Sequence, residues 1–173
     1  MKLKGLLVLT AILVTVCSFG FAAQSEKEYA DPDGQYKFSL IGDWKAISYK
    51  DAVGRGKTEF VYRDRSEGLL KISKENLSGG DLTSMVRQEE ETLKIYRAGF
   101  ERGASEGFGA GELKGVRFSF YNTDSRRPKA NTYYYLQDGE SVWVLRFSGE
   151  RGTLDAIRNI TDQMARTFRP LRN

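Results

Sequence analysis

Residues 130–148 have the sequence ANTYYYLQDGESVWVLRFS, in which two runs of β-branched and aromatic residues flank Asp138-Gly139. An Asp-Gly pair between two such runs is typical of a two-residue β-hairpin turn. Counting outward from that turn places Tyr134 opposite Trp143. The stretch therefore predicts a long antiparallel hairpin at the centre of a sheet.

Side chains alternate between the two faces of this hairpin, and both faces are rich in large apolar groups. One face carries Tyr134, Leu136, Trp143, Leu145 and Phe147, and the other carries Tyr133, Tyr135, Val142, Val144 and Arg146. Both faces should therefore be covered. For the second face two interpretations stay open. It is either core beneath a helix or a partner-binding surface, because aromatic and arginine side chains are enriched at binding hot spots. The partner-binding candidates on it are Tyr133, Tyr135, Val144 and Arg146.

The flanking sequence predicts further strands and two amphipathic helices around the hairpin. The strands are expected at 36–40, 44–49, 58–63, 69–74 and 112–121, and the helices at 82–97 and from Thr153 to Phe168. Asp81 is the expected N-cap of the first helix and Thr153 that of the second. Residues 24–30 are expected to be a loose lead-in, and residues 103–111 either a weak strand or a loop.

Residues 1–23 have the pattern of a secretory signal peptide. Lys2 and Lys4 precede an apolar run from Leu6 to Val16, and small residues follow up to Ala23. The run is shorter than the roughly 20 residues of a membrane-spanning helix. We therefore expect one extracytoplasmic domain, residues 24–173, in the periplasm or secreted. An alternative is lipid attachment through Cys17, which the bulky residue before it disfavours.

Composition excludes several classes of site. Loss of Lys2 and Lys4 would reduce the basic residues from 27 to 25, against 23 acidic ones. That near-balance argues against non-specific nucleic-acid binding. The sequence has no histidine, and its one cysteine, Cys17, lies in the signal segment. No cofactor, no metal site and no catalytic residue is therefore predicted. An enzyme would have to rely on carboxylates, Lys, Tyr or Arg.

Three polar features have both a structural and a functional interpretation. Asp31-Pro32-Asp33-Gly34 is a strong turn signal and only half of a calcium loop. The run Glu89–Glu91 is expected to be a solvated helix face. Arg126, Arg127 and Lys129 form a local basic cluster, which is either a solvated loop or a contact for an anionic partner or a lipid headgroup.

Three stretches resemble the PsbP family of extrinsic photosystem subunits and its wider superfamily, which includes the periplasmic protein DcrB. They are YADPDGQYKFSL (29–40) followed by GDW (42–44), TYYY (132–135) leading to VWVL (142–145), and ARTFR (165–169). Two features depart from the family pattern. Gly42-Asp43 replaces the usual proline before the tryptophan strand, and the histidines of some photosynthetic members are missing.

The resemblance implies an α+β fold in which an antiparallel β-sheet is flanked by helices, a PsbP-like α/β/α sandwich. It also implies a non-catalytic binding or assembly-support role, with a protein or a membrane-associated complex as partner. Two other functions stay open from the residues alone. One is a hydrolase or small-ligand-binding enzyme that uses carboxylates and tyrosines, and the other is an envelope component anchored through Cys17.

Overall fold

The computed structural model describes residues 25–77, 79–124 and 126–171, so the expected signal segment and Cys17 lie outside the described residues. The elements in chain order are β1 (Glu26–Ala30), β2 (Tyr36–Ile41), β3 (Trp44–Lys50), β4 (Gly56–Tyr62), β5 (Gly68–Asn76), α1 (Leu82–Tyr96), β6 (Phe100–Ala110), β7 (Leu113–Asn122), β8 (Lys129–Asp138), β9 (Ser141–Glu150), α2 (Arg151–Ala156), α3 (Arg158–Thr167) and β10 (Arg169–Pro170).

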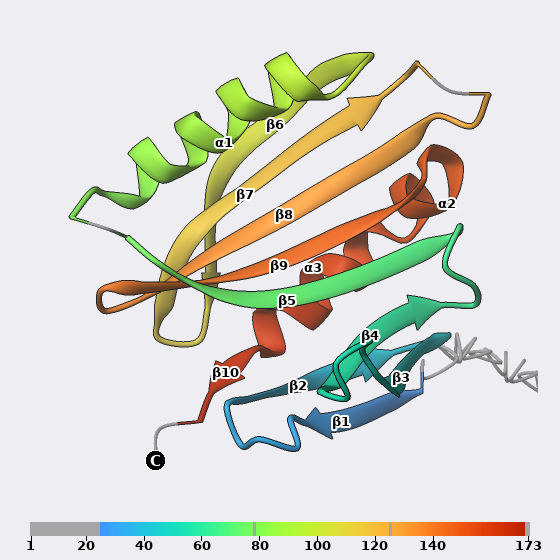
Figure 1. Ribbon diagram of the computed structural model, residues 1–173, viewed down its shortest axis with the longest axis vertical. Helices are drawn as coiled ribbons and strands as arrows, with labels where there is room; N and C mark the ends of the chain where they lie inside the picture. Colours follow the sequence, from blue (N-terminus) through green and yellow to red (C-terminus); the bar gives the residue numbers. More distant parts are fainter. Residues whose placement is uncertain (1–24, 78, 125, 172–173) are drawn as a thin grey trace, which may run out of the picture.

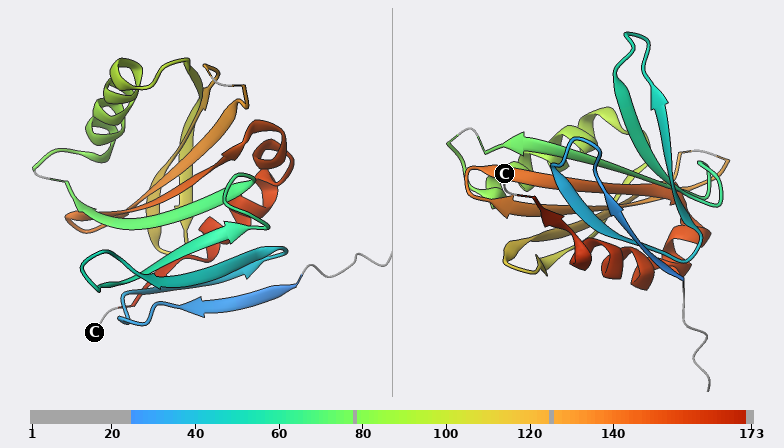
Figure 2. Two further views of the ribbon diagram at one scale, coloured as in Figure 1. Left: turned by 45° about the vertical axis from the view of Figure 1, so that its right-hand side comes forward. Right: turned by 90° about the horizontal axis from the view of Figure 1, so that it is seen from below.

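Two antiparallel sheets form the body of the molecule (Figure 1). The large sheet has the strand order β3-β4-β5-β9-β8-β7-β6, and the small sheet has the order β1-β2-β10. Figure 2 shows α1 and α3 on opposite sides of the large sheet. This arrangement confirms the predicted α+β fold with helices on both sides of an antiparallel sheet.

The first hairpin face packs against the small sheet, α2 and α3. Its members Tyr134, Leu136, Trp143, Leu145 and Phe147 are all buried in one cluster. The Trp143 ring lies 5.5 Å from Tyr36 of β2 and 5.4 Å from Phe168 at the end of α3. Aromatic contacts from both neighbouring layers therefore lock the hairpin into the core.

The second hairpin face forms a separate core beneath α1. Val86 and Leu93 of α1 are buried there together with Phe118, Phe120, Tyr133, Tyr135, Val142 and Val144 of the sheet. The oxygen of Asp81 accepts the Ser84 amide at 2.7 Å, which confirms the predicted N-cap. The neighbouring Glu89–Glu91 run is not wholly solvated, because Glu90 is buried and its carboxylate lies 2.9 Å from Arg102.

The hairpin turn lies one residue later than the sequence suggested. Asp138 pairs with Ser141, so the two turn residues are Gly139 and Glu140, and Tyr134 lies opposite Leu145 instead of Trp143. Gly139 has φ 63°, the positive angle that a type II′ turn needs at its first central position. The shift moves each cross-strand partner by two residues, so the predicted faces are unchanged.

Two other predictions are corrected, and one with two open interpretations is decided. Residues 26–30, expected to be a lead-in, pair with β2 as strand β1, because the Tyr29 ring packs on Phe60 at 4.8 Å. For residues 103–111 the strand interpretation is confirmed in place of the loop, since β6 spans Phe100–Ala110. The C-terminal helical region begins at Arg151, with Glu150 in the cap position in place of Thr153, and is interrupted at Ile157.

Candidate interaction surface

Helix α1 covers only one end of its side of the large sheet. It packs on β7 and β8, far in strand order from β3 and β4. By register, the α1 side of β3, β4, β5 and β9 carries residues that we call the open face: Lys45, Ile47, Tyr49, Lys57, Glu59, Lys71, Ser73, Glu75 and Arg146. Ile47 and Tyr49 are each 40% exposed, so apolar side chains here face solvent.

Arg146 marks the boundary between the covered and the open parts of this side. Its guanidinium donates to Ser73 Oγ at 2.7 Å and to Glu75 Oε1 at 2.8 Å. The same group lies 5.5 Å from the centre of the Tyr133 ring, at the edge of the core beneath α1. Burial raises the pKa of Tyr133, opposed by the positive charge of Arg146, so Tyr133 is a neutral neighbour at physiological pH.

Glu59 is the centre of a second set of polar contacts, farther out on the open face. Its carboxylate lies 2.9 Å from Arg65 and 3.8 Å from Lys71. It also accepts a hydrogen bond from the Tyr49 hydroxyl at 3.2 Å. Partial desolvation and the negative charge of Glu59 raise the pKa of Tyr49, which keeps this hydroxyl a hydrogen-bond donor.

The β3–β4 hairpin extends beyond the rest of the sheet. The β3–β4 ladder has seven residue pairs, whereas β4 pairs with β5 only through Phe60–Leu70 and Val61–Leu69. Residues 45–58, which we call the arm, therefore project from the body, as the right-hand view of Figure 2 shows. A Cβ atom added at Gly54 or Gly56 would meet no heavy atom within 4 Å, so the end of the arm is in open space.

The arm is strongly basic. It contains Lys45, Lys50, Arg55 and Lys57 but only one acidic residue, Asp51, so its net charge is +3. Asp51 is bound by Arg55 at 2.9 Å. Lys45 and Lys50 form no ion pair with any residue that the structure describes. The arm thus combines unpaired positive charge with the exposed Ile47, Tyr49 and Val53, the last 72% exposed.

Comparison with known proteins identifies the fold. No protein-family model and no curated protein sequence matches the chain. Among solved structures, cyanobacterial PsbP (CyanoP) from Synechocystis is 13% identical with a TM-score of 0.58, and the match covers 91% of this chain and 98% of that one. This chain has the PsbP-like fold.

Two further structures share the fold. LpqN of Mycobacterium tuberculosis, involved in cell envelope biogenesis, is 12% identical with a TM-score of 0.57, and the match covers 86% of this chain and 92% of LpqN. The Saccharomyces cerevisiae Ran-binding protein Mog1p is 11% identical with a TM-score of 0.59, and the match covers 86% of this chain and 96% of Mog1p. At identities of 11–13% these comparisons show a shared fold and say nothing about the side chains of the open face.

The PsbP-like fold separates the predicted partner-binding residues of the second hairpin face. Tyr133, Tyr135 and Val144 are 7%, 1% and 0% exposed beneath α1, which corrects their placement on a surface and confirms the core interpretation. Arg146 alone reaches the open face. The alternation of side chains along the hairpin correctly placed these four residues on one face of the sheet. It could not show how far α1 extends over that face.

The basic cluster predicted in the β7–β8 loop lies at one end of the sheet. Arg126 and Arg127 line a shallow pocket of about 570 Å³ together with Arg151, and Lys129 begins β8. Arg127 also lies 3.2 Å from Glu150, which partly neutralises the cluster. Contact of Arg126, Arg127 and Lys129 with an anionic partner stays a prediction.

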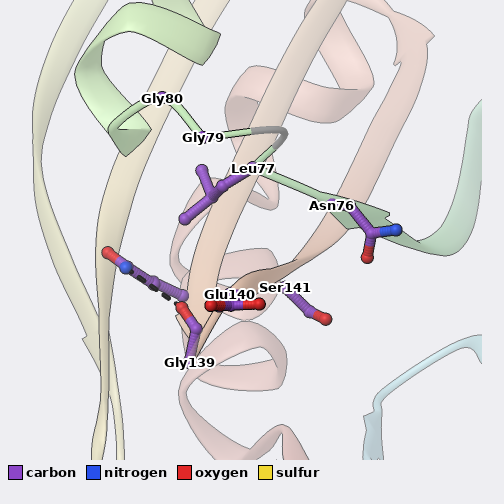
Figure 3. A pocket seen from close by; sticks show the side chains of 8 residues that line it. Asn76, Leu77, Gly79, Gly80, Gly139, Glu140 and Ser141 are labelled. Atoms are coloured by element: carbon purple, nitrogen blue, oxygen red, sulfur yellow. Dashed lines mark hydrogen bonds between the residues drawn. The ribbon is translucent and has the colours of Figure 1, made fainter.

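The pocket in Figure 3 lies between the β5–α1 connection and the β8–β9 turn and has a volume of about 590 Å³. Its lining consists of Asn76, Leu77, Gly79, Gly80, Gln137, Gly139, Glu140 and Ser141. Glu140 is the single ionisable residue in this lining, so the pocket lacks a carboxylate pair for acid–base chemistry.

Several carboxylates elsewhere have structural contacts. Arg117 binds Asp162 at 2.6 Å and Glu106 at 2.8 Å, and thereby ties α3 to the sheet. Asp31 accepts the Gln35 amide at 3.2 Å in the predicted turn. Within the described ranges there is no group of three or more His, Cys, Asp or Glu residues placed to hold a metal.

Proposed function

We propose that this chain is an extracytoplasmic, non-catalytic binding or assembly-support protein that holds a protein partner on its open face and arm. The observation that carries the proposal is the exposure of Ile47 and Tyr49 among basic side chains, on strands against which none of the described helices packs closely. Aromatic and apolar groups within a charged rim are typical of protein-binding surfaces.

The fold neighbours support a binding role without naming the partner. Mog1p is a Ran-binding protein, and LpqN is involved in cell envelope biogenesis. The signal-like pattern of residues 1–23 supports the extracytoplasmic location. The pairing of Asp162 and Glu106 with Arg117 supports the absence of catalysis, because both carboxylates serve a structural contact between α3, β6 and β7.

The test uses two matched pairs of substitutions in the full chain. Ile47→Asp with Tyr49→Asp alters the open face, and Ile95→Asp with Tyr96→Asp alters an Ile and a Tyr at the end of α1 that are 73% and 79% exposed. A tagged chain is purified from its native source in each form. We expect one protein to co-purify in stoichiometric amount and to fall at least about tenfold with the open-face pair alone, since two interface residues each contribute about 1 kcal/mol or more.

Equal recovery of that protein with both pairs would show that the open face does not bind it. Circular dichroism of each variant confirms that the fold is retained, which exposed positions should allow.

A further inference from the structure

Strand β3 is the outermost strand of the large sheet along the arm. It is the first strand in the sheet order and pairs with β4 on one side. All its residues after Trp44, from Lys45 to Lys50, are exposed. Among the described residues no strand pairs with the other edge of β3, so six consecutive residues present a sheet edge long enough to pair with an added strand.

Backbone groups on such an edge form hydrogen bonds with any extended chain that lies beside it. The arm projects from the body, and both views of Figure 2 show it at a distance from α1. The alternation along β3 would place Ile47 and Tyr49 next to side chains on one face of the incoming strand, and Ala46 and Ser48 next to those on the other.

The positive charge along β3 determines which kind of strand can pair with it favourably. Lys45 and Lys50 lie at the two ends of the exposed stretch and form no ion pair with a described residue. In a second copy of this chain, the same edge would bring two more lysines and no acidic residue, because residues 45–50 have the sequence KAISYK. Self-pairing would therefore add positive charge without a counter-charge, whereas an acidic strand would supply one.

A lipid surface fits the same residues less well. Three exposed apolar side chains, Ile47, Tyr49 and Val53, give little area for insertion. The open backbone edge would also lose its hydrogen bonds to water in a hydrocarbon environment. An extended polypeptide satisfies both the backbone edge and the charge.

We infer that the β3 edge takes an extended acidic segment of the partner protein as an added strand. This inference rests on the proposed function, because it specifies how a protein partner would engage the arm. The segment should carry acidic residues opposite Lys45 and Lys50 and an apolar residue next to Ile47 and Tyr49.

The probe is a capped, fluorescently labelled peptide, Glu-Val-Thr-Val-Thr-Glu, which matches β3 in antiparallel register. Its controls are the peptide with lysine in place of both glutamates and the acidic peptide with alternate backbone nitrogens methylated, which cannot donate along one edge. Binding to the full chain is measured by fluorescence anisotropy, and amide hydrogen exchange locates the contact. We expect slowed exchange confined to residues 45–50 and at least about tenfold weaker binding of both control peptides.

Charge reversal gives the sharper comparison. Lys45→Glu with Lys50→Glu should reverse the preference, so that the lysine peptide binds at least about tenfold more tightly than the glutamate peptide. Lys27→Glu with Lys114→Glu, two exposed strand positions away from the arm, should leave the original preference unchanged.

The inference would be overturned by equal binding of the methylated peptide, by protection outside the arm, or by an unchanged peptide preference in the Lys45/Lys50 double variant. Protection of the arm by anionic phospholipid vesicles but not by the acidic peptide would overturn it in favour of a membrane contact. If the peptide tests fail while Ile47→Asp with Tyr49→Asp still releases the co-purifying protein, strand addition is wrong and the protein-binding function stands. If that protein is retained, the proposed function itself fails.

Discussion

The Tyr134 hydroxyl donates a hydrogen bond to Asp162 at 2.6 Å and so joins the central strand β8 to helix α3. Its neighbour Tyr135 points to the opposite side of the sheet, beneath α1, where its buried hydroxyl has no hydrogen-bond partner among the described residues. The Tyr134 hydroxyl also lies 3.2 Å from Thr161 Oγ1, so two adjacent tyrosines of similar burial differ in the hydrogen bonding of their hydroxyls, and this difference can be measured.

Tyr134→Phe and Tyr135→Phe should have different effects on stability. Removing the Tyr134 hydroxyl deprives Asp162 of a donor and should lower the free energy of unfolding by about 1–2 kcal/mol. Removing the Tyr135 hydroxyl takes away an unsatisfied polar group and should be neutral or stabilising by up to about 1 kcal/mol. Urea unfolding measures both, and an equal loss in the two variants would contradict the assigned contacts.

Stability should fall steeply in alkaline solution. Burial raises the pKa of Tyr36, Tyr134 and Tyr135 in the folded chain above the ordinary value of 10. Below pH 10 these tyrosines are neutral in both states, and their contribution to stability is fully present. As the pH rises above 10 they ionise first in the unfolded chain, which favours unfolding. The urea midpoint should therefore drop above pH 10 and drop less in Tyr135→Phe, whereas an identical pH profile would contradict this explanation.

Trp143→Ala should be severely destabilising. The side chain is 3% exposed and packs on Tyr36 and Phe168. Emptying such a site costs about 3–5 kcal/mol. Tyr96→Ala, at a position 79% exposed on α1, is the control and should change stability by less than about 0.5 kcal/mol. Similar urea midpoints for the two variants would place Trp143 outside the core.

Processing of the N-terminus should give a chain that starts at Ala23 or Gln24. The expectation follows from the basic start, the short apolar run and the small residues that follow it. Intact mass spectrometry of the chain from its native source measures the cleavage point. A lipid-modified N-terminal Cys17 would instead support the anchored alternative.

The hairpin shows what the sequence could and could not predict. Alternation assigned Tyr134 and Trp143 to the same buried face, and that assignment is insensitive to a two-residue change of register. The register itself depends on whether Gly139 takes the first or the second central position of the turn, and glycine suits both positions. Strand β1 was missed because Glu26–Ala30 has no apolar alternation and forms only by pairing with β2.

The candidate surface was harder to predict than the core. The length of α1 was visible in its apolar stripe, but its position over β7 and β8 depends on tertiary packing. The arm arises because β4 and β5 diverge after two residue pairs, which no local pattern encodes. One feature of the sequence did indicate an exposed strand. After Trp44, the positions that alternate with Ile47 and Tyr49 hold small or polar residues, namely Ala46, Ser48 and Lys50. That pattern suits an edge strand.

The most direct test of the central claim is site-specific photo-crosslinking in the native source. A photoreactive phenylalanine replaces Tyr49 on the open face in one form of the chain and Tyr96 on α1 in the other; the two positions are 40% and 79% exposed. If the open face binds a protein, Tyr49 gives a discrete crosslinked species containing one other protein, and the more exposed Tyr96 does not. Crosslinks to that protein of equal yield at both positions, or none at Tyr49, would contradict the claim.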